Sequence, residues 1–166
     1  IRTLGDPETE GSISVINAVS PPGGDFSEPV TQSSLRLSGA FWALDKSLAQ
    51  QRHFPAINWQ NSHTLYDESL SGFFRQELGE DWKTLRFFLS EKLSKEKALL
   101  ELVQLVGRDG LSEQDKWTLN LSELSRVVFL QQNAFDSADA FCSLQKMKGL
   151  LETLRSLDTL VSERLA

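Results

Sequence analysis

The sequence predicts a mainly α-helical protein, in which the C-terminal remnant of an α/β domain precedes an α-helical bundle domain. From Leu78 onward, apolar residues recur every three or four positions, which is the spacing of one helix face. The earlier part of the chain alternates extended and helical patterns but offers only about two strands, too few for a stable sheet of their own. We therefore expect the α/β piece over residues 1–72 and the helical domain over residues 73–166.

The first element expected is a buried strand at Ile13–Val19, which is a short apolar run. The following run, Pro21–Gly24, can neither continue a strand nor start a helix, because proline lacks an N–H donor and glycine permits positive φ. This run must form a shaped loop, and Asp25 and Phe26 follow it directly. Loops are common places for contact residues, but a plain turn into the next helix, with Phe26 as an anchor, explains this one somewhat better.

A helix is expected to begin at Ser27–Pro29 and to end near Gln51. Ser27 can cap it, and proline is tolerated in the first helical turn. Beyond this helix, Pro55 favours an extended backbone at Phe54. The apolar residues of the predicted helix follow spacings of four, three and four, and they are Leu37, Phe41, Leu44 and Leu48.

Four helices are expected in the second part of the chain. The second begins at Ser94 and ends at Gly107, the third begins at Ser112, and the last begins at about Ser143. Their apolar stripes are expected to form the core of a bundle. The stripes are Leu78, Trp82, Leu85 and Leu89; Leu99, Leu102, Val103 and Val106; Trp117, Leu121, Leu124 and Val128; and Met147, Leu150, Leu154, Leu157 and Val161.

Charge and motifs exclude several classes of function. The net charge is -6 and no run of Lys or Arg occurs, which argues against a nucleic-acid partner. No glycine is followed by lysine, so Gly23 and Gly24 do not end a phosphate-binding loop of the Gly-Lys-Ser/Thr kind. No metal site is predicted from His53 and His63, the only histidines, because zinc needs three or four ligands. Cys142 lies in an apolar setting and is expected to pack rather than react.

Localisation follows from the same composition. No apolar run is long enough to span a bilayer, and a single cysteine gives no disulfide framework. The chain is therefore expected to be cytoplasmic, with any membrane association coming only through partner proteins.

Five segments resemble the catalytic A subunit of V-type and A-type rotary ATPases, in the same order as in that family. The resemblance covers nearly all of the chain. It implies that the chain is the C-terminal part of the subunit, comprising the end of the α/β nucleotide-binding domain and the helical domain. In the family the phosphate-binding loop and the acidic catalytic residues lie earlier, which implies no catalytic residue here. The segments are Ala18–Thr31, Phe41–Asp45, Arg52–Trp59, Val103–Gly107 and Phe129–Phe135.

The resemblance also implies one wall of an adenine pocket. Phe54, next to Pro55, would stack on the adenine of ATP or ADP, which the complete subunit would bind with Mg. Gln132, Ala134 and Phe135 would close the other side of the pocket. With no phosphate-binding loop, the isolated chain is expected to be inactive and to hold no bound cofactor.

A second implied contact is the loop formed by Gly23, Gly24, Asp25 and Phe26, which would face the rotating central stalk. The partners implied are that stalk and the non-catalytic B subunit, in an alternating A3B3 ring that couples ATP synthesis or hydrolysis to proton or sodium transport. The membrane would be reached only through this complex.

Two other functions remain compatible with parts of the sequence. Composition and helical periodicity fit an independent helical protein-binding module equally well. A small hydrolase using His53 with Asp25 or Asp45 as acid and base is conceivable, but only the presence of the residues supports it.

Overall fold

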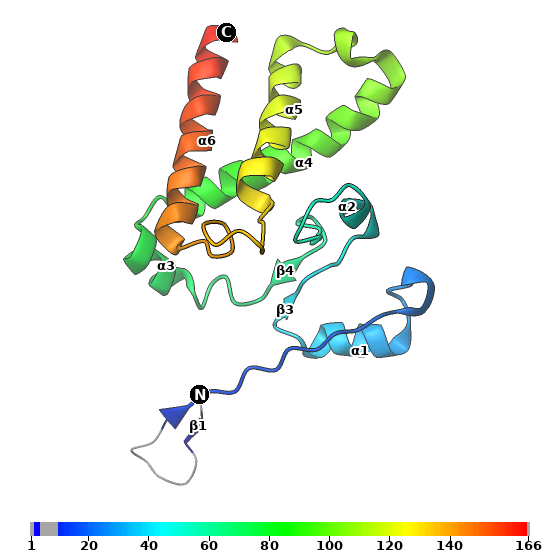
Figure 1. Ribbon diagram of the computed structural model, residues 1–166, viewed down its shortest axis with the longest axis vertical. Helices are drawn as coiled ribbons and strands as arrows, with labels where there is room; N and C mark the ends of the chain where they lie inside the picture. The colour runs from blue at the N-terminus through cyan, green and yellow to red at the C-terminus, as the bar shows by residue number, and fades with distance from the viewer. Residues whose placement is uncertain (1, 4–9, 166) are drawn as a thin grey trace. The chain divides into compact units, whose positions relative to one another are not determined.

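The computed structural model describes residues 2–3 and 10–165 (Figure 1). The chain falls into two compact units, Ile1–Gly39 and Ala40–Ala166. The prediction of a mainly α-helical chain is confirmed, because helices make up most of the second unit. The domain boundary expected at residue 72 stays a prediction. None of the helices in the described part of the chain is long and apolar enough to cross a membrane.

The described residues of the first unit form a two-stranded sheet and one α-helix. Strands β1 (Arg2–Thr3) and β2 (Glu10–Gly11) pair antiparallel, with Arg2 opposite Gly11 and Thr3 opposite Glu10. A tight turn, η1 (Pro22–Gly24), precedes helix α1 (Pro29–Leu37). The segment between β2 and η1 is irregular.

The prediction of a buried strand at Ile13–Val19 is wrong. These residues form no strand, and Ile13 and Ile16 are 89% and 87% exposed. A strand stays in place only when a neighbour satisfies its backbone N–H and C=O groups. Among the described residues, none pairs with this segment, so its apolar side chains have nothing to pack against.

The helix predicted to run to Gln51 ends much earlier, because α1 stops at Leu37. The backbone N–H and the hydroxyl of Ser38 both donate to the carbonyl oxygen of Ser34, at 3.1 and 2.7 Å, and these bonds close the helix end. The cap at its start is also different from the prediction. The carboxylate of Glu28, rather than Ser27, accepts the backbone N–H groups of Val30 and Thr31.

The second unit begins with a small irregular layer. Strand β3 (Ala40–Phe41) pairs antiparallel with β4 (His63–Thr64), and the short helix α2 (Lys46–Gln50) lies between them in the sequence. The helix face predicted to include Leu44 does not exist, because Leu44 lies outside any helix and forms an isolated bridge with Ile57.

Five helical elements follow. They are α3 (Ser71–Leu78), α4 (Trp82–Val106), α5 (Glu113–Ser125), the π-helical turn η3 (Arg126–Leu130) and α6 (Leu144–Leu165), with a short turn η2 (Arg108–Gly110) between α4 and α5. Helix α4 crosses the pair formed by α5 and α6, which run beside each other in opposite directions (Figure 1).

Four of the predicted helix boundaries in this part can be judged. The start at about Ser143 is confirmed, because α6 begins at Leu144 and the Ser143 Oγ accepts the N–H of Lys146 at 3.1 Å. The start of a helix at Ser94 is wrong: α4 is continuous there, because the Ser94 hydroxyl donates to the carbonyl oxygen of Ser90 at 2.8 Å and the backbone is left undisturbed. The end at Gly107 is confirmed, with a φ of 77° at that glycine. The cap at Ser112 is confirmed too, since its Oγ accepts the N–H of Asp115 at 3.1 Å.

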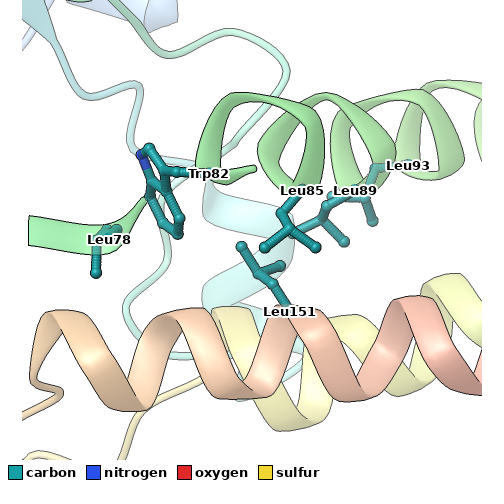
Figure 2. Close-up of a cluster of buried hydrophobic side chains, with 6 residues drawn as sticks. All are labelled: Leu78, Trp82, Leu85, Leu89, Leu93 and Leu151. Carbon is teal, nitrogen blue, oxygen red and sulfur yellow. The ribbon is translucent and has the colours of Figure 1, made fainter. Parts of the chain in front are cut away.

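The core of the bundle forms where α3 and α4 meet α6. Leu85 and Leu89 point toward Leu151 of α6, while Trp82 at the start of α4 and Leu78 at the end of α3 extend the cluster (Figure 2). Burial of Leu78, Trp82, Leu85 and Leu89 is confirmed, but the single helix predicted from their spacing is wrong, because α3 ends at Leu78 and α4 begins only at Trp82. The α5 stripe is right at Leu121 and in part at Trp117, which is half-buried, whereas Leu124 and Val128 are exposed. The other buried residues of α5 are Thr118, Leu119, Ser122 and Ser125.

A polar cluster joins the three long helices. The carboxylate of Asp158 on α6 pairs with the ammonium group of Lys92 on α4. The Nζ atom of Lys92 lies 2.9 Å from Oδ1 and 2.8 Å from Oδ2 of Asp158. The same carboxylate accepts the indole N–H of Trp117 on α5 at 2.9 Å. Lys92 and Asp158 are largely buried, so this single carboxylate links one side chain from each helix in a partly dry setting.

Candidate functional site

The site residue Phe54 lies on a loop that is closed by a clamp of hydrogen bonds. The backbone N–H of Asp45 donates to Ala56 at 2.9 Å, and that of Asn58 donates to Ala43 at 2.7 Å. The side-chain amide of Asn58 also donates to the Asp45 carboxylate at 2.8 Å. The clamp therefore fixes both ends of the segment that carries Phe54.

Asp45 has a second role within this clamp, as the cap of α2. Its carboxylate accepts the backbone N–H groups of Ser47 and Leu48 and the hydroxyl of Ser47. These bonds, chiefly those from the Ser47 hydroxyl and the Asn58 amide, lower the pKa of Asp45 to about 2. The group is therefore a fixed anion at neutral pH, which suits a structural cap better than an acid or base.

The backbone just before Phe54 turns sharply. Arg52 adopts a φ of 59°, an uncommon value for a residue with a side chain, and the N–H of His53 donates to Leu48 at 2.9 Å. His53 is thereby buried with its ring edge-on to Trp59, at a centroid distance of 5.8 Å. Phe54 follows with a cis peptide bond to Pro55, and its side chain is 51% exposed.

The burial of His53 disfavours the role of general base, because the residue is only 8% exposed and has little access to a substrate. Burial lowers the pKa of its imidazole, and the nearby positive charge of Arg126 lowers it further. His53 therefore stays neutral at physiological pH and is buried beside Trp59. The carboxylate of Asp45 is occupied by Ser47, Leu48 and Asn58, and that of Asp25 by Ser27. Nothing in these contacts supports the hydrolase alternative.

The second segment of the predicted pocket starts where α5 ends in the π-helical turn η3. The N–H of Gln131 donates to the carbonyl oxygen of Arg126 at 2.8 Å and ends the turn, and Gln131 is extended. The N–H of Gln132 then donates to the carbonyl oxygen of Phe54 at 2.8 Å. Two segments far apart in the sequence therefore meet at Phe54 and Gln132, which the resemblance places on opposite sides of one adenine.

The loop after Gln132 is held by its own turns. The N–H of Asn133 donates to Asp139 at 2.7 Å, and the side chain of Asn133 accepts the N–H of Phe135 at 3.0 Å. Lys146, at the start of α6, donates to the carbonyl oxygen of Ala138 at 3.2 Å. This loop presents Ala134 and Phe135 to solvent, and the ring of Phe135 is fully exposed.

The structure therefore brings together some of the predicted pocket residues and leaves others open. Phe54 and Gln132 are bonded through their backbones, with Pro55 alongside. Ala134 and Phe135 lie on the adjoining loop. Their roles toward adenine remain predictions. Sequence reasoning missed the ion pair between Arg126 and Glu96, because two opposite charges thirty positions apart form no recognisable pattern.

A hollow of about 830 Å³ lies elsewhere in the second unit, between the Trp59 loop, one face of α4 and the start of α6. Leu89, Leu93 and Leu151 contribute to its lining, whereas none of the predicted adenine-pocket residues does. This hollow is a continuation of the bundle core and is separate from the surface at Phe54.

The predicted stalk-facing loop lies in the first unit. Gly23 and Gly24 have φ of 66° and 75°, and the N–H of Gly24 donates to Pro21 at 3.1 Å. A Cβ atom added at either glycine would meet no described atom within 4 Å outside its chain neighbours. Asp25 accepts both the hydroxyl and the N–H of Ser27, at 2.7 and 2.9 Å, which lowers its pKa. Phe26 is exposed.

Comparison with protein families identifies two matching regions. Residues 71–165 match the C-terminal domain of V and A type ATP synthase. Residues 2–64 match the nucleotide-binding domain of the ATP synthase alpha/beta family. The order of these regions agrees with the α/β remnant and helical domain predicted from the sequence.

Individual relatives agree along the whole chain. The A subunit of the A-type ATP synthase of Methanosphaera stadtmanae is 48% identical over 166 residues, which is 100% of this chain and 28% of that protein. The V-type ATP synthase alpha chain of Halothermothrix orenii is 49% identical over 157 residues, which is 95% of this chain and 26% of that protein. The chain thus spans about a quarter of the length of these relatives.

A solved structure supports the fold. The ATP synthase subunit NeqB from Nanoarcheaum equitans matches with a TM-score of 0.69, covering 83% of this chain and 34% of that chain at 20% identity. At this identity the likeness concerns the fold alone. Taken with the two matching regions, these comparisons show that the chain belongs to the V and A type ATP synthase family, whose C-terminal domain it carries at residues 71–165.

Proposed function

We propose that this chain works as the C-terminal part of a catalytic A subunit, which couples ATP synthesis or hydrolysis to the transport of protons or sodium ions. Its own contribution is one wall of the adenine pocket. The observation that carries this proposal is the 2.8 Å hydrogen bond from Gln132 to Phe54. It joins the two segments that the family resemblance assigns to opposite sides of one base.

The exposed aromatic rings give the wall its chemistry. Phe54 is half exposed on a clamped loop, and Phe135 is fully exposed on a loop held by Asn133 and Asp139. Stacking of a base on an aromatic side chain contributes roughly 1–3 kcal/mol and needs only an accessible ring face. The side chain of Gln132 can supply hydrogen bonds to the edge of adenine.

The triphosphate and its Mg ion must be bound by other parts of the protein. This chain has no Gly-Lys-Ser/Thr sequence, and binding of the phosphates in such enzymes depends on that loop. The 166 residues alone are therefore proposed to be inactive. The complete subunit would alternate with the non-catalytic B subunit in a ring and reach the membrane only through the complex.

The adenine assignment can be tested in the complete subunit within its complex. Phe54→Ala and Phe135→Ala should each weaken ATP binding by about tenfold, equivalent to about 1.4 kcal/mol. The matched control is Phe141→Ala, because Phe141 is also exposed but lies outside the proposed wall. Unchanged ATP affinity in both pocket variants would refute the assignment.

The proposed stalk contact needs a different measurement. Asp25 and Phe26 follow a tight turn and are exposed, so truncating them should leave the fold of the unit intact. In the assembled complex, Asp25→Ala together with Phe26→Ala should reduce ion transport per ATP while ATP affinity stays unchanged. Val30→Ala, at an exposed position on α1, is the control. Full coupling in the double variant would rule the contact out.

A further inference from the structure

The turn that leads into the proposed adenine wall is anchored by an ion pair with α4. Arg126 is the first residue of η3, and its guanidinium pairs with the carboxylate of Glu96. Glu96 lies in the middle of α4 and is only 5% exposed. A buried carboxylate requires a partner, so this pair fixes the place where η3 begins.

The same arginine is connected to both segments of the wall. Its carbonyl oxygen accepts the N–H of Gln131, the residue before the one that bonds to Phe54. Its positive charge also acts on the imidazole of His53, the residue before Phe54. The two connections reach the wall from opposite sides of the Gln132–Phe54 bond.

Because η3 is π-helical, the Arg126–Glu96 ion pair at its first residue can affect the position of everything that follows. Single π-helical turns are rare and often mark functional sites. Such a turn accommodates an extra residue, so relaxing it to an α-helix would rotate everything after it by about 100° around the helix axis. A rotation of that size would carry Gln132 away from Phe54 and turn Phe135 in another direction.

We infer that Arg126 and Glu96 are positioning residues for adenine binding: their ion pair holds η3 in its π-helical form, and η3 in turn holds Gln132 and Phe135 beside Phe54. Neither residue needs to touch the nucleotide. The inference rests on the proposed adenine wall and adds to it a fixed connection between the wall and the helical domain.

The test uses the complete subunit in its assembled complex and measures KM and kcat for ATP hydrolysis, well below the melting temperature. Arg126→Met and Glu96→Gln should each raise KM for ATP by about tenfold with a smaller change in kcat. Arg126→Lys keeps the charge and should stay within about threefold of the original KM. Glu96→Gln keeps the side-chain shape and serves if Arg126→Met fails to assemble.

Asp158→Asn is the matched control, because it disturbs another largely buried ion pair of the same bundle that has no bond to the wall. It should lower the melting temperature and leave KM within about twofold. An equal rise of KM in Asp158→Asn would mean general loosening of the bundle and would overturn the inference.

The outcome also separates this inference from the function on which it rests. If Phe54→Ala raises KM but Arg126→Met and Glu96→Gln do not, the positioning role is wrong and the adenine wall stands. If Phe54→Ala and Phe135→Ala leave KM unchanged, the adenine wall itself is wrong, and so is the positioning role derived from it.

Discussion

The backbone N–H of Gln132 donates to the carbonyl oxygen of Phe54 at 2.8 Å, and this bond is the direct link between two loops of the second unit. Gln132→Pro would remove the donor. The extended backbone of Gln131, with ψ of 141°, already suits a residue that precedes proline. We expect the free energy of unfolding to fall by about 1 kcal/mol, measured by urea denaturation. Gln132→Ala keeps the backbone N–H and should lower the free energy of unfolding by less than about half as much. Equal losses from the two substitutions would contradict the stabilising role of this hydrogen bond.

The carboxylate of Asp158 should be among the most sensitive polar positions of the bundle. Asp158→Asn leaves the ammonium group of Lys92 largely buried without a counter-charge, and breaking a buried pair in this way costs about 3 kcal/mol. Urea denaturation should show that loss. The control is Lys95→Ala, which removes an exposed pair with Glu91 and should change stability by less than about 0.5 kcal/mol. Similar effects from both substitutions would show that burial does not govern the pair.

Leu151 should be a determinant of core packing, because it is fully buried against Leu85 and Leu89 (Figure 2). Leu151→Ala removes apolar contacts and leaves a cavity, and we expect a loss of about 3–4 kcal/mol in the free energy of unfolding. Leu160→Ala, on the exposed face of the same helix, should cost well under about 1 kcal/mol. A loss below about 1 kcal/mol at Leu151 would mean that the cluster is not tightly packed.

His53 should titrate below its ordinary pKa, first because burial disfavours the charged ring and second because of the charge of Arg126. The folded chain then binds this proton less readily than the unfolded chain. The stability contributed by neutral His53 is therefore present above the ordinary pKa of about 6.5 and is lost as pH falls through the lower, folded pKa.

An NMR titration of the imidazole checks this directly. A His53 pKa at or above about 6.5 would contradict the burial seen in the structure. Arg126→Met should raise the pKa of His53, because it removes one of the two causes that lower this pKa. Lys95→Ala should leave the pKa of His53 unchanged.

The bundle was largely predictable because its signals are local. Trp82, Leu85 and Leu89 share one face of α4 and form the core together with Leu78, the last residue of α3, and Ser112 caps α5 as expected. The same kind of reasoning failed at Ser94, since a serine that starts helices also fits inside one when its hydroxyl donates to the preceding turn.

The first part of the chain misled the prediction for a different reason. Leu37 and Leu44 follow helical spacing, yet Ser38 ends α1 directly after Leu37. Asp45, directly after Leu44, caps a separate helix that ends before Gln51. Periodicity records which residues would share a face, but capping decides whether the helix continues. At Ile13–Val19 the residue types suit a strand, but a strand depends on neighbours that the segment itself does not contain.

The residues of the candidate site differ in whether the sequence could reveal them. Phe54, Gln132 and Phe135 came from resemblance to a family, and the backbone bond between the first two agrees with placing them together. Glu96 and Arg126 came only from the structure. A single glutamate within a charged stretch of α4 looks like part of a solvated face, and only tertiary packing shows that it is buried.

Gly23 and Gly24 have a consequence for chemical synthesis. Both have positive φ, while a Cβ atom at either would meet no described atom beyond the chain neighbours. An L-residue is therefore disfavoured at these positions by the positive φ of the backbone and not by a steric clash of its side chain. A mirror-image residue such as D-alanine favours positive φ, so it should fit either position and stiffen the turn by narrowing the unfolded ensemble.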